Sequence, residues 1–120
     1  MLFGKKKKIS MYLTEKNVSP STIPFDMLLS EYLSGTLKEK LQKLTMTQVD
    51  IHIDWLADYK CINIQGKIDD YYFDIQVEPV TYSIAYAKDE PEDGEEFNLQ
   101  NVAVFYETIE NTVRKIRSSK

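Results

Sequence analysis

The chain has 120 residues, 42% of them hydrophobic, and a net charge of −4, which is typical of one folded domain and excludes disordered and fibrous classes. A single cysteine, Cys61, excludes an intramolecular disulfide and favours a cytoplasmic location. No apolar run reaches the length of a signal-peptide core or a membrane span, so we expect no membrane insertion.

The N-terminal 20 residues are predicted to form a flexible basic tail, and residues 21–120 a single α+β domain. The tail contains lysines at all four positions of 5–8. A few charges without a lipid anchor or an amphipathic face bind membranes weakly. We therefore expect this cluster to aid solubility rather than to hold a membrane or a nucleic acid.

An N-terminal helix is predicted from Ile23, because apolar residues then recur at helical spacing and Pro24 suits a first helical turn. Gly35 should end or kink this helix. Thr36 and Glu39 together predict a capping box that starts a new helix. One bent helix and two separate helices are both compatible with this pattern.

Residues 45–87 contain four runs of alternating apolar and polar residues, which predict a four-stranded antiparallel meander. Such alternation argues against a parallel sheet that is buried on both faces. The larger side chains that we expect on the apolar face are Val49, Ile51, Ile53, Trp55, Ile62, Ile64, Tyr71, Phe73, Ile75, Val77, Val80, Tyr82, Ile84 and Tyr86.

The connections between the runs are short. Residues 57–58 and 66–70 carry turn chemistry, and Gly66 can adopt a positive φ at little cost. Pro79 should lie at a turn or at a strand start, where its missing N–H breaks no ladder bond. A bulge at Pro79 would instead merge the last two runs into one bent strand.

The C-terminal helix is predicted to begin after Asn98 as its N-cap. Its apolar stripe consists of Leu99, Val102, Tyr106, Ile109, Val113 and Ile116. This stripe is expected to cover the apolar sheet face together with the N-terminal helix. The fold class is thus a two-layer α+β domain, with both helices on one face of the sheet.

Acidic residues dominate the middle of the chain. Residues 50–96 contain thirteen acidic residues and three lysines. Such a surface repels phosphate backbones and attracts a basic partner, so nucleic-acid binding is not expected. Residues 88–96 are predicted to form a solvated acidic loop. They lack the ligand spacing of an EF-hand calcium loop.

The polar face of the sheet and the acidic loop are the candidate binding surface. The residues proposed for it are Asp50, His52, Asp54, Tyr72, Asp74, Glu90, Glu92, Asp93 and Glu95. No catalytic glycine motif can be made from the four glycines, and one histidine with one cysteine is too few for a typical zinc site. We assign no catalytic residue, metal ligand or cofactor.

The order of helix, four strands and helix is loosely similar, in architecture alone, to bacterial secretion chaperones and toxin-immunity proteins. Together with the charge, this predicts a non-catalytic protein-interaction module that binds a basic partner protein. One alternative is a small metal-dependent enzyme that uses Asp50, His52 and Asp54. Another is a subunit that self-associates, for example as a homodimer, through a sheet edge or its open face.

Overall fold

The computed structural model describes residues 21–45 and 50–118. The predicted basic tail lies outside these residues. The elements in chain order are α2 (Ile23–Ser34), α3 (Thr36–Thr45), β1 (Ile51–Leu56), the 3-10 turn η1 (Ala57–Tyr59), β2 (Cys61–Ile68), β3 (Tyr71–Val77), β4 (Thr81–Ala87), β5 (Glu95–Asn98) and α4 (Val102–Ser118). The five strands form one antiparallel meander in the order β1-β2-β3-β4-β5.

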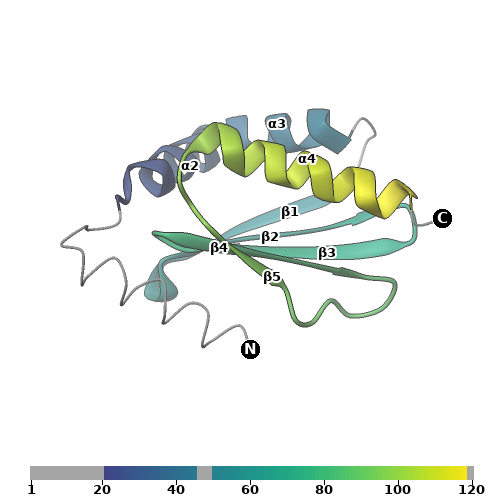
Figure 1. Ribbon diagram of the computed structural model, residues 1–120. Coiled ribbons are helices and arrows are strands. Elements are labelled where there is room, and N and C mark those ends of the chain that lie inside the picture. Colours follow the sequence, from purple (N-terminus) through teal and green to yellow (C-terminus); the bar gives the residue numbers. More distant parts are fainter. Residues whose placement is uncertain (1–20, 46–49, 119–120) are drawn as a thin grey trace.

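The helices of the described chain lie together on one face of the sheet, and no helix of residues 21–45 or 50–118 covers the opposite face (Figure 1). The predicted α+β class is confirmed. The predicted number of strands is wrong, because a fifth strand follows the acidic loop. We call this opposite face the open face.

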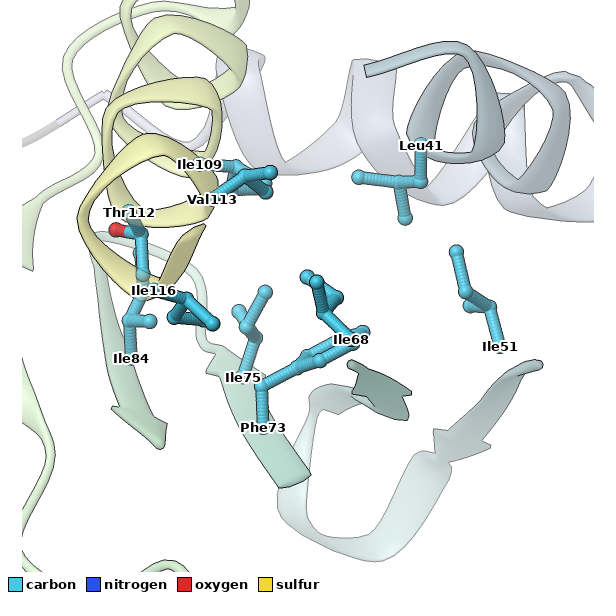
Figure 2. Close-up of a pocket in the computed structure, with 10 residues that line it drawn as sticks. All are labelled: Leu41, Ile51, Ile68, Phe73, Ile75, Ile84, Ile109, Thr112, Val113 and Ile116. Atoms are coloured by element: carbon cyan, nitrogen blue, oxygen red, sulfur yellow. The ribbon is translucent and has the colours of Figure 1, made fainter. Parts of the chain in front are cut away.

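The core lies between the sheet and the helices. A row of isoleucines crosses the middle of the sheet, where Ile53 pairs with Ile64, Ile64 with Ile75, and Ile75 with Ile84. The helix α4 covers this row with Phe105, Ile109, Val113 and Ile116, all buried. Figure 2 shows side chains of α4, α3 and the sheet pointing toward one another in this layer. The predicted alternation therefore assigned most of the buried side chains of β1 to β4 correctly. Three residues depart from it, because Cys61 and Thr81 of the other face are also buried and Tyr86 is 38% exposed.

Gly35 divides the N-terminal helical region into two helices. Its φ of 84° is left-handed, and its N–H bonds to the Tyr32 carbonyl at 3.1 Å, which closes α2. Thr36 is the first residue of α3, and its Oγ1 pairs with Ser34 Oγ at 2.9 Å. The Glu39 N–H instead bonds to the Gly35 carbonyl at 3.5 Å. Of the two alternatives that the sequence left open, the structure has two separate helices, and the predicted capping box is wrong.

The connection at Pro79 is a turn. The Glu78 N–H donates to the Thr81 carbonyl at 2.8 Å, so β3 and β4 are two strands of a hairpin. The turn between β2 and β3 is shorter than predicted and has Asp69 at a φ of 55°. Gly66 lies inside β2, opposite Phe73 of β3, and is not part of the turn.

The strand β5 replaces the predicted start of the last helix. Asn98 ends β5 opposite Thr81 and does not cap a helix. The helix α4 begins at Val102, and Asn101 Oδ1 accepts the Val104 N–H at 2.8 Å, which is an N-cap bond. The Phe97 ring stacks on Tyr82 at 5.1 Å, so the apolar side of β5 joins the core.

Candidate functional site

The open face presents the polar residues of each strand in register. His52 of β1 lies opposite Gln65 of β2, and Gln65 lies opposite Asp74 of β3. The next row begins with Asp54 opposite Asn63. Strand alternation places these residues on the face opposite the core. The predicted site residues of β1 and β3 therefore share one surface.

Asp74 is held on this surface by hydrogen bonds from two side chains of β2. Its Oδ1 accepts a hydrogen bond from Asn63 Nδ2 at 2.8 Å, and its Oδ2 accepts one from Gln65 Nε2 at 3.3 Å. Both donors are neutral amides, so they orient Asp74 without cancelling its charge. Each oxygen keeps acceptor capacity for a further donor. The arrangement is suited to receive a cationic donor such as a guanidinium.

The acidic segment between β4 and β5 runs along the open side of the sheet, away from the helices (Figure 1). It ends at Gly94, where an added Cβ would lie 3.2 Å from the Ile84 carbonyl carbon and 3.3 Å from Ser83 Cβ. The loop backbone therefore contacts β4 directly. We call residues 88–94 the acidic loop, since residues 95–98 belong to β5.

Two hollows lie on the open face beside the acidic loop. The larger hollow, of about 610 Å³, is lined by Asp50, His52, Gln65, Gly66, Lys67, Tyr72, Phe73, Asp74, Asp89, Glu90 and Pro91. The smaller hollow, of about 250 Å³, is lined by Asp74, Gln76, Ser83, Ala85, Pro91, Glu92, Asp93 and Gly94. Asp74 and Pro91 line both. Carboxylates of the sheet and of the loop thus surround one continuous acidic region.

An aromatic side chain borders the larger hollow. Tyr72 is 44% exposed, and Lys67 Nζ lies 5.1 Å from the centre of its ring. A tyrosine face in this position can stack against a planar cation. The larger hollow therefore combines carboxylates with an aromatic surface that already receives one cation.

Glu95 does not join the other predicted binding residues. It lies opposite Ile84 on β4, which places it on the helix side of the sheet. There it lines a separate hollow with Tyr86 and Lys115. Its neighbour Glu96 lies opposite Ser83 on the open side. The sequence did not separate these two glutamates because β5 was predicted as loop.

The carboxylates near His52 are not grouped around one point in the part of the chain that the structure describes. His52 Nε2 lies 3.1 Å from Asp54 Oδ2, and both side chains are at least half exposed. Asp74 is directed to its two amide donors. Across residues 21–45 and 50–118, no three His, Cys, Asp or Glu side chains are grouped so that they could hold a metal ion.

Cys61 and His52 are also far apart. Cys61 pairs with Leu56, whereas His52 pairs with Gln65, four positions further along β2. At about 3.3 Å per residue, the two side chains are roughly 13 Å apart. A thiol and an imidazole at that separation cannot exchange a proton directly.

The interior space between α4 and the sheet, shown in Figure 2, has the character of a packing defect. Its volume is about 20 Å³, and it is lined mainly by aliphatic side chains such as Ile75, Ile109 and Val113. Ligand pockets are typically about 300–1,000 Å³ with a few polar groups for orientation. This space is too small to hold a metabolite.

Lys67 and Pro91 are lining residues that the sequence analysis did not select. Lys67 belongs to β2, which extends two residues beyond Gly66 because the turn is shorter than expected. Continuing the alternation from Gln65 to Lys67 would have placed it on the open face. The position of Pro91 depends on how the loop folds over the sheet, for which the sequence carries no periodic signal.

The chain matches no family model, no curated protein and no solved structure. In the part of the chain that the structure describes, no helix has the length and apolar character needed to cross a membrane.

Proposed function

We propose that this protein is a non-catalytic interaction module that binds a basic segment of a partner protein on the open face. The observation that carries this proposal is the continuous acidic region formed by the two hollows. It brings together Asp50, which directly precedes β1, Asp74 of β3, which lines both hollows, and the carboxylates of the acidic loop. A basic partner is favoured because the residues that line the two hollows include several carboxylates and a single lysine.

The proposed recognition follows from the orientation of Asp74 and Tyr72. An arginine guanidinium that enters the larger hollow would donate to the free acceptor positions of Asp74 and stack near Tyr72. The carboxylates of the acidic loop would then meet neighbouring basic residues of the same segment. Electrostatic complementarity of this kind increases the association rate and weakens as salt is added.

The metal-dependent enzyme is the weaker alternative. It requires carboxylates and His52 to converge on one point, whereas His52 pairs with Asp54 and Asp74 is bound to amides. An interaction surface has no such requirement, because its carboxylates can each meet a different group of the partner. The observed spread of charges therefore favours the interaction module.

The first test neutralises the acidic loop. The loop variant carries Asp89→Asn, Glu90→Gln, Glu92→Gln and Asp93→Asn. Exposed ion pairs contribute about 0.2–1 kcal/mol each, so we expect this variant to bind a fluorescent arginine-rich peptide roughly 10- to 100-fold more weakly. Fluorescence anisotropy at two salt concentrations measures the change, and the affinity of the unmodified protein should fall with salt.

A matched control separates the position of the charges from their number. The control variant carries Asp26→Asn, Glu39→Gln, Asp58→Asn and Glu107→Gln, four exposed residues that line neither hollow. It has the same net charge as the loop variant, and we expect it to bind nearly as well as the unmodified protein. Equal weakening in both variants would show that net charge alone attracts the peptide, and would refute the proposed surface.

The same variants identify the partner in a cell lysate. Immobilised protein should retain a stoichiometric basic protein, and the loop variant should not retain it. Asp74→Asn should also reduce retention, because it removes the charge shared by both hollows. If the same proteins are retained by the unmodified protein and by both Asp74→Asn and the loop variant, the open face is not the binding surface.

A further inference from the structure

The outer edge of β1 is unpaired within the described residues, where β1 has β2 as its strand neighbour. Edge strands of monomeric proteins are usually short, bulged, or protected by lysine or proline. The strand β1 has six residues, IHIDWL, without lysine, proline or glycine, and its register with β2 is continuous. The other edge strand, β5, has four residues and two glutamates. The edge of β1 is thus the less protected of the two.

The helix side of β1 is incompletely covered. Ile53 and Trp55 are half-buried, whereas Ile62 and Ile64 on the adjacent strand are 0% exposed. Trp55 contacts Phe25 of α2, with ring centres 6.0 Å apart. The same helix exposes further apolar side chains, namely Ile23, Met27 and Leu33. Two half-buried apolar side chains of β1, Ile53 and Trp55, therefore lie along the unpaired edge.

We propose that β1 pairs with β1 of a second copy of this chain, antiparallel and centred on Ile53, so that the two sheets become one continuous sheet. A two-fold axis perpendicular to the sheet relates the copies. Both helix layers then lie on one side, and both open faces lie on the other. Backbone hydrogen bonds supply the contact, as in strand addition to a sheet edge.

The side chains of β1 select this register. Opposite residues in an antiparallel pair point to the same face, so the two-fold axis must pass through a residue and cannot pass between two residues. An axis at His52 places Asp50 opposite Asp54 of the second copy, and an axis at Asp54 places that carboxylate opposite itself. Like charges in these positions are destabilising.

An axis at Ile53 instead pairs complementary groups. It places His52 opposite Asp54 of the second copy, and symmetry repeats this pair. The same register places Ile51 opposite Trp55 on the helix side. Within one chain His52 Nε2 and Asp54 Oδ2 already lie 3.1 Å apart, so the two groups are compatible partners. The strand is self-complementary in this register.

The pairing would also place the two larger hollows beside each other, because Asp50 and His52 line each of them. The dimer and the binding of a basic partner remain separate properties. The charges of the acidic loop lie outside β1, so the loop variant should dimerise normally. Failure of one proposal can therefore be distinguished from failure of the other.

Sedimentation of the full chain over a range of concentrations tests the dimer. We expect the mass to rise from 14.0 kDa to twice that value. His52→Asp creates a like-charge pair twice across the axis and should raise the dimer dissociation constant about tenfold. The double variant His52→Asp with Asp54→Lys restores opposite charges and should restore the dimer. Gln76→Asp adds the same charge to the middle strand β3 and should leave the dimer unchanged.

Hydrogen exchange locates the contact. The amides of residues 51–56 that point away from β2 should exchange more slowly as the protein concentration rises. A mass that stays at 14.0 kDa at every concentration would overturn the proposal. A dimer in which the exchange rates of the β1 amides do not depend on concentration would also overturn it. Slow exchange of these amides in a monomer would overturn it as well, because the edge would then be covered by the chain itself.

Discussion

At the scale of single residues, Gly66 shows how the sheet depends on a close approach. A Cβ at this position would lie 2.5 Å from Phe73 Cζ and 2.7 Å from the Asp50 carbonyl oxygen. The Phe73 ring occupies the space that a side chain of residue 66 would need. Glycine is therefore required by packing here and not by backbone conformation.

Gly66→Ala should destabilise the protein. The added methyl group must displace both a core ring and a backbone carbonyl, and overpacking of this kind costs about 1–3 kcal/mol. Urea unfolding followed by circular dichroism measures the loss. Gly94→Ala is the control, because its nearest atoms are 3.2 Å away. A loss at Gly66 no larger than that at Gly94 would contradict the packing explanation.

At the scale of elements, one polar cluster joins the three helices of the described chain. Glu31 Oε1 of α2 accepts a hydrogen bond from the Tyr106 hydroxyl of α4 at 2.6 Å and pairs with Lys40 Nζ of α3 at 3.1 Å. Lys40 also lies 5.4 Å from the centre of the Tyr106 ring. Tyr106 is 75 residues from Glu31 in the sequence, so only the packing of α4 against α2 brings these two together.

Tyr106→Phe removes the hydroxyl and leaves the ring in place. A hydrogen bond to a charged group contributes about 1.5–3 kcal/mol, and partial exposure of this cluster lowers the expected loss to about 1–2 kcal/mol. Urea unfolding at neutral pH measures it. Tyr59→Phe is the control, since Tyr59 is 79% exposed and should not affect stability. Equal stability of Tyr106→Phe and the unmodified protein would show that the cluster is not stabilising.

The same cluster predicts how stability depends on alkaline pH. Burial raises the pKa of Tyr106 well above its ordinary value of 10.0, and the hydrogen bond and the charge of Glu31 raise it further. Below about pH 10 both states are protonated, so this contribution is fully present. As the pH rises above 10, the unfolded state loses the proton first and stability falls. We expect the alkaline decrease in unfolding free energy to be smaller in Tyr106→Phe than in the unmodified protein.

At the scale of the whole molecule, the two layers leave a small apolar space under α4. Figure 2 shows Val113 of α4 above Ile68 and Ile75 of the sheet, with Leu41 of α3 at the side. The space measures about 20 Å³ and is lined mainly by aliphatic side chains, so it should be dry. Such a space reduces packing contacts without offering a binding site.

Val113→Ile should fill this space and stabilise the protein. One added methyl group that is accommodated without strain contributes about 0.5–1 kcal/mol. Thermal unfolding measures the gain. Val77→Ile is the control, because Val77 is 1% exposed and does not line the space. We expect that variant to lose stability through overpacking, and equal effects of both substitutions would contradict the assignment of the space.

Three features follow from the sequence: the α+β class, most of the buried face of β1 to β4, and an interruption of the N-terminal helix at Gly35. These features depend on local chemistry, namely strand alternation and the left-handed conformation of Gly35. It also identified Asp50, His52, Tyr72 and Asp74 as residues of one face, because period-2 alternation fixes the face of a strand residue.

Tertiary contacts are needed to account for the existence of β5, the side on which Glu95 lies, and the position of the acidic loop over the open face. The strand β5 has four residues, which is too short and too acidic a segment to show an alternation of apolar and polar residues. Its pairing with β4 is fixed by contacts across the loop. Alternation tells which residues share a face, whereas only pairing tells which segments meet. The candidate site lies where the acidic loop meets the sheet, and this contact between distant segments has no local signal in the sequence.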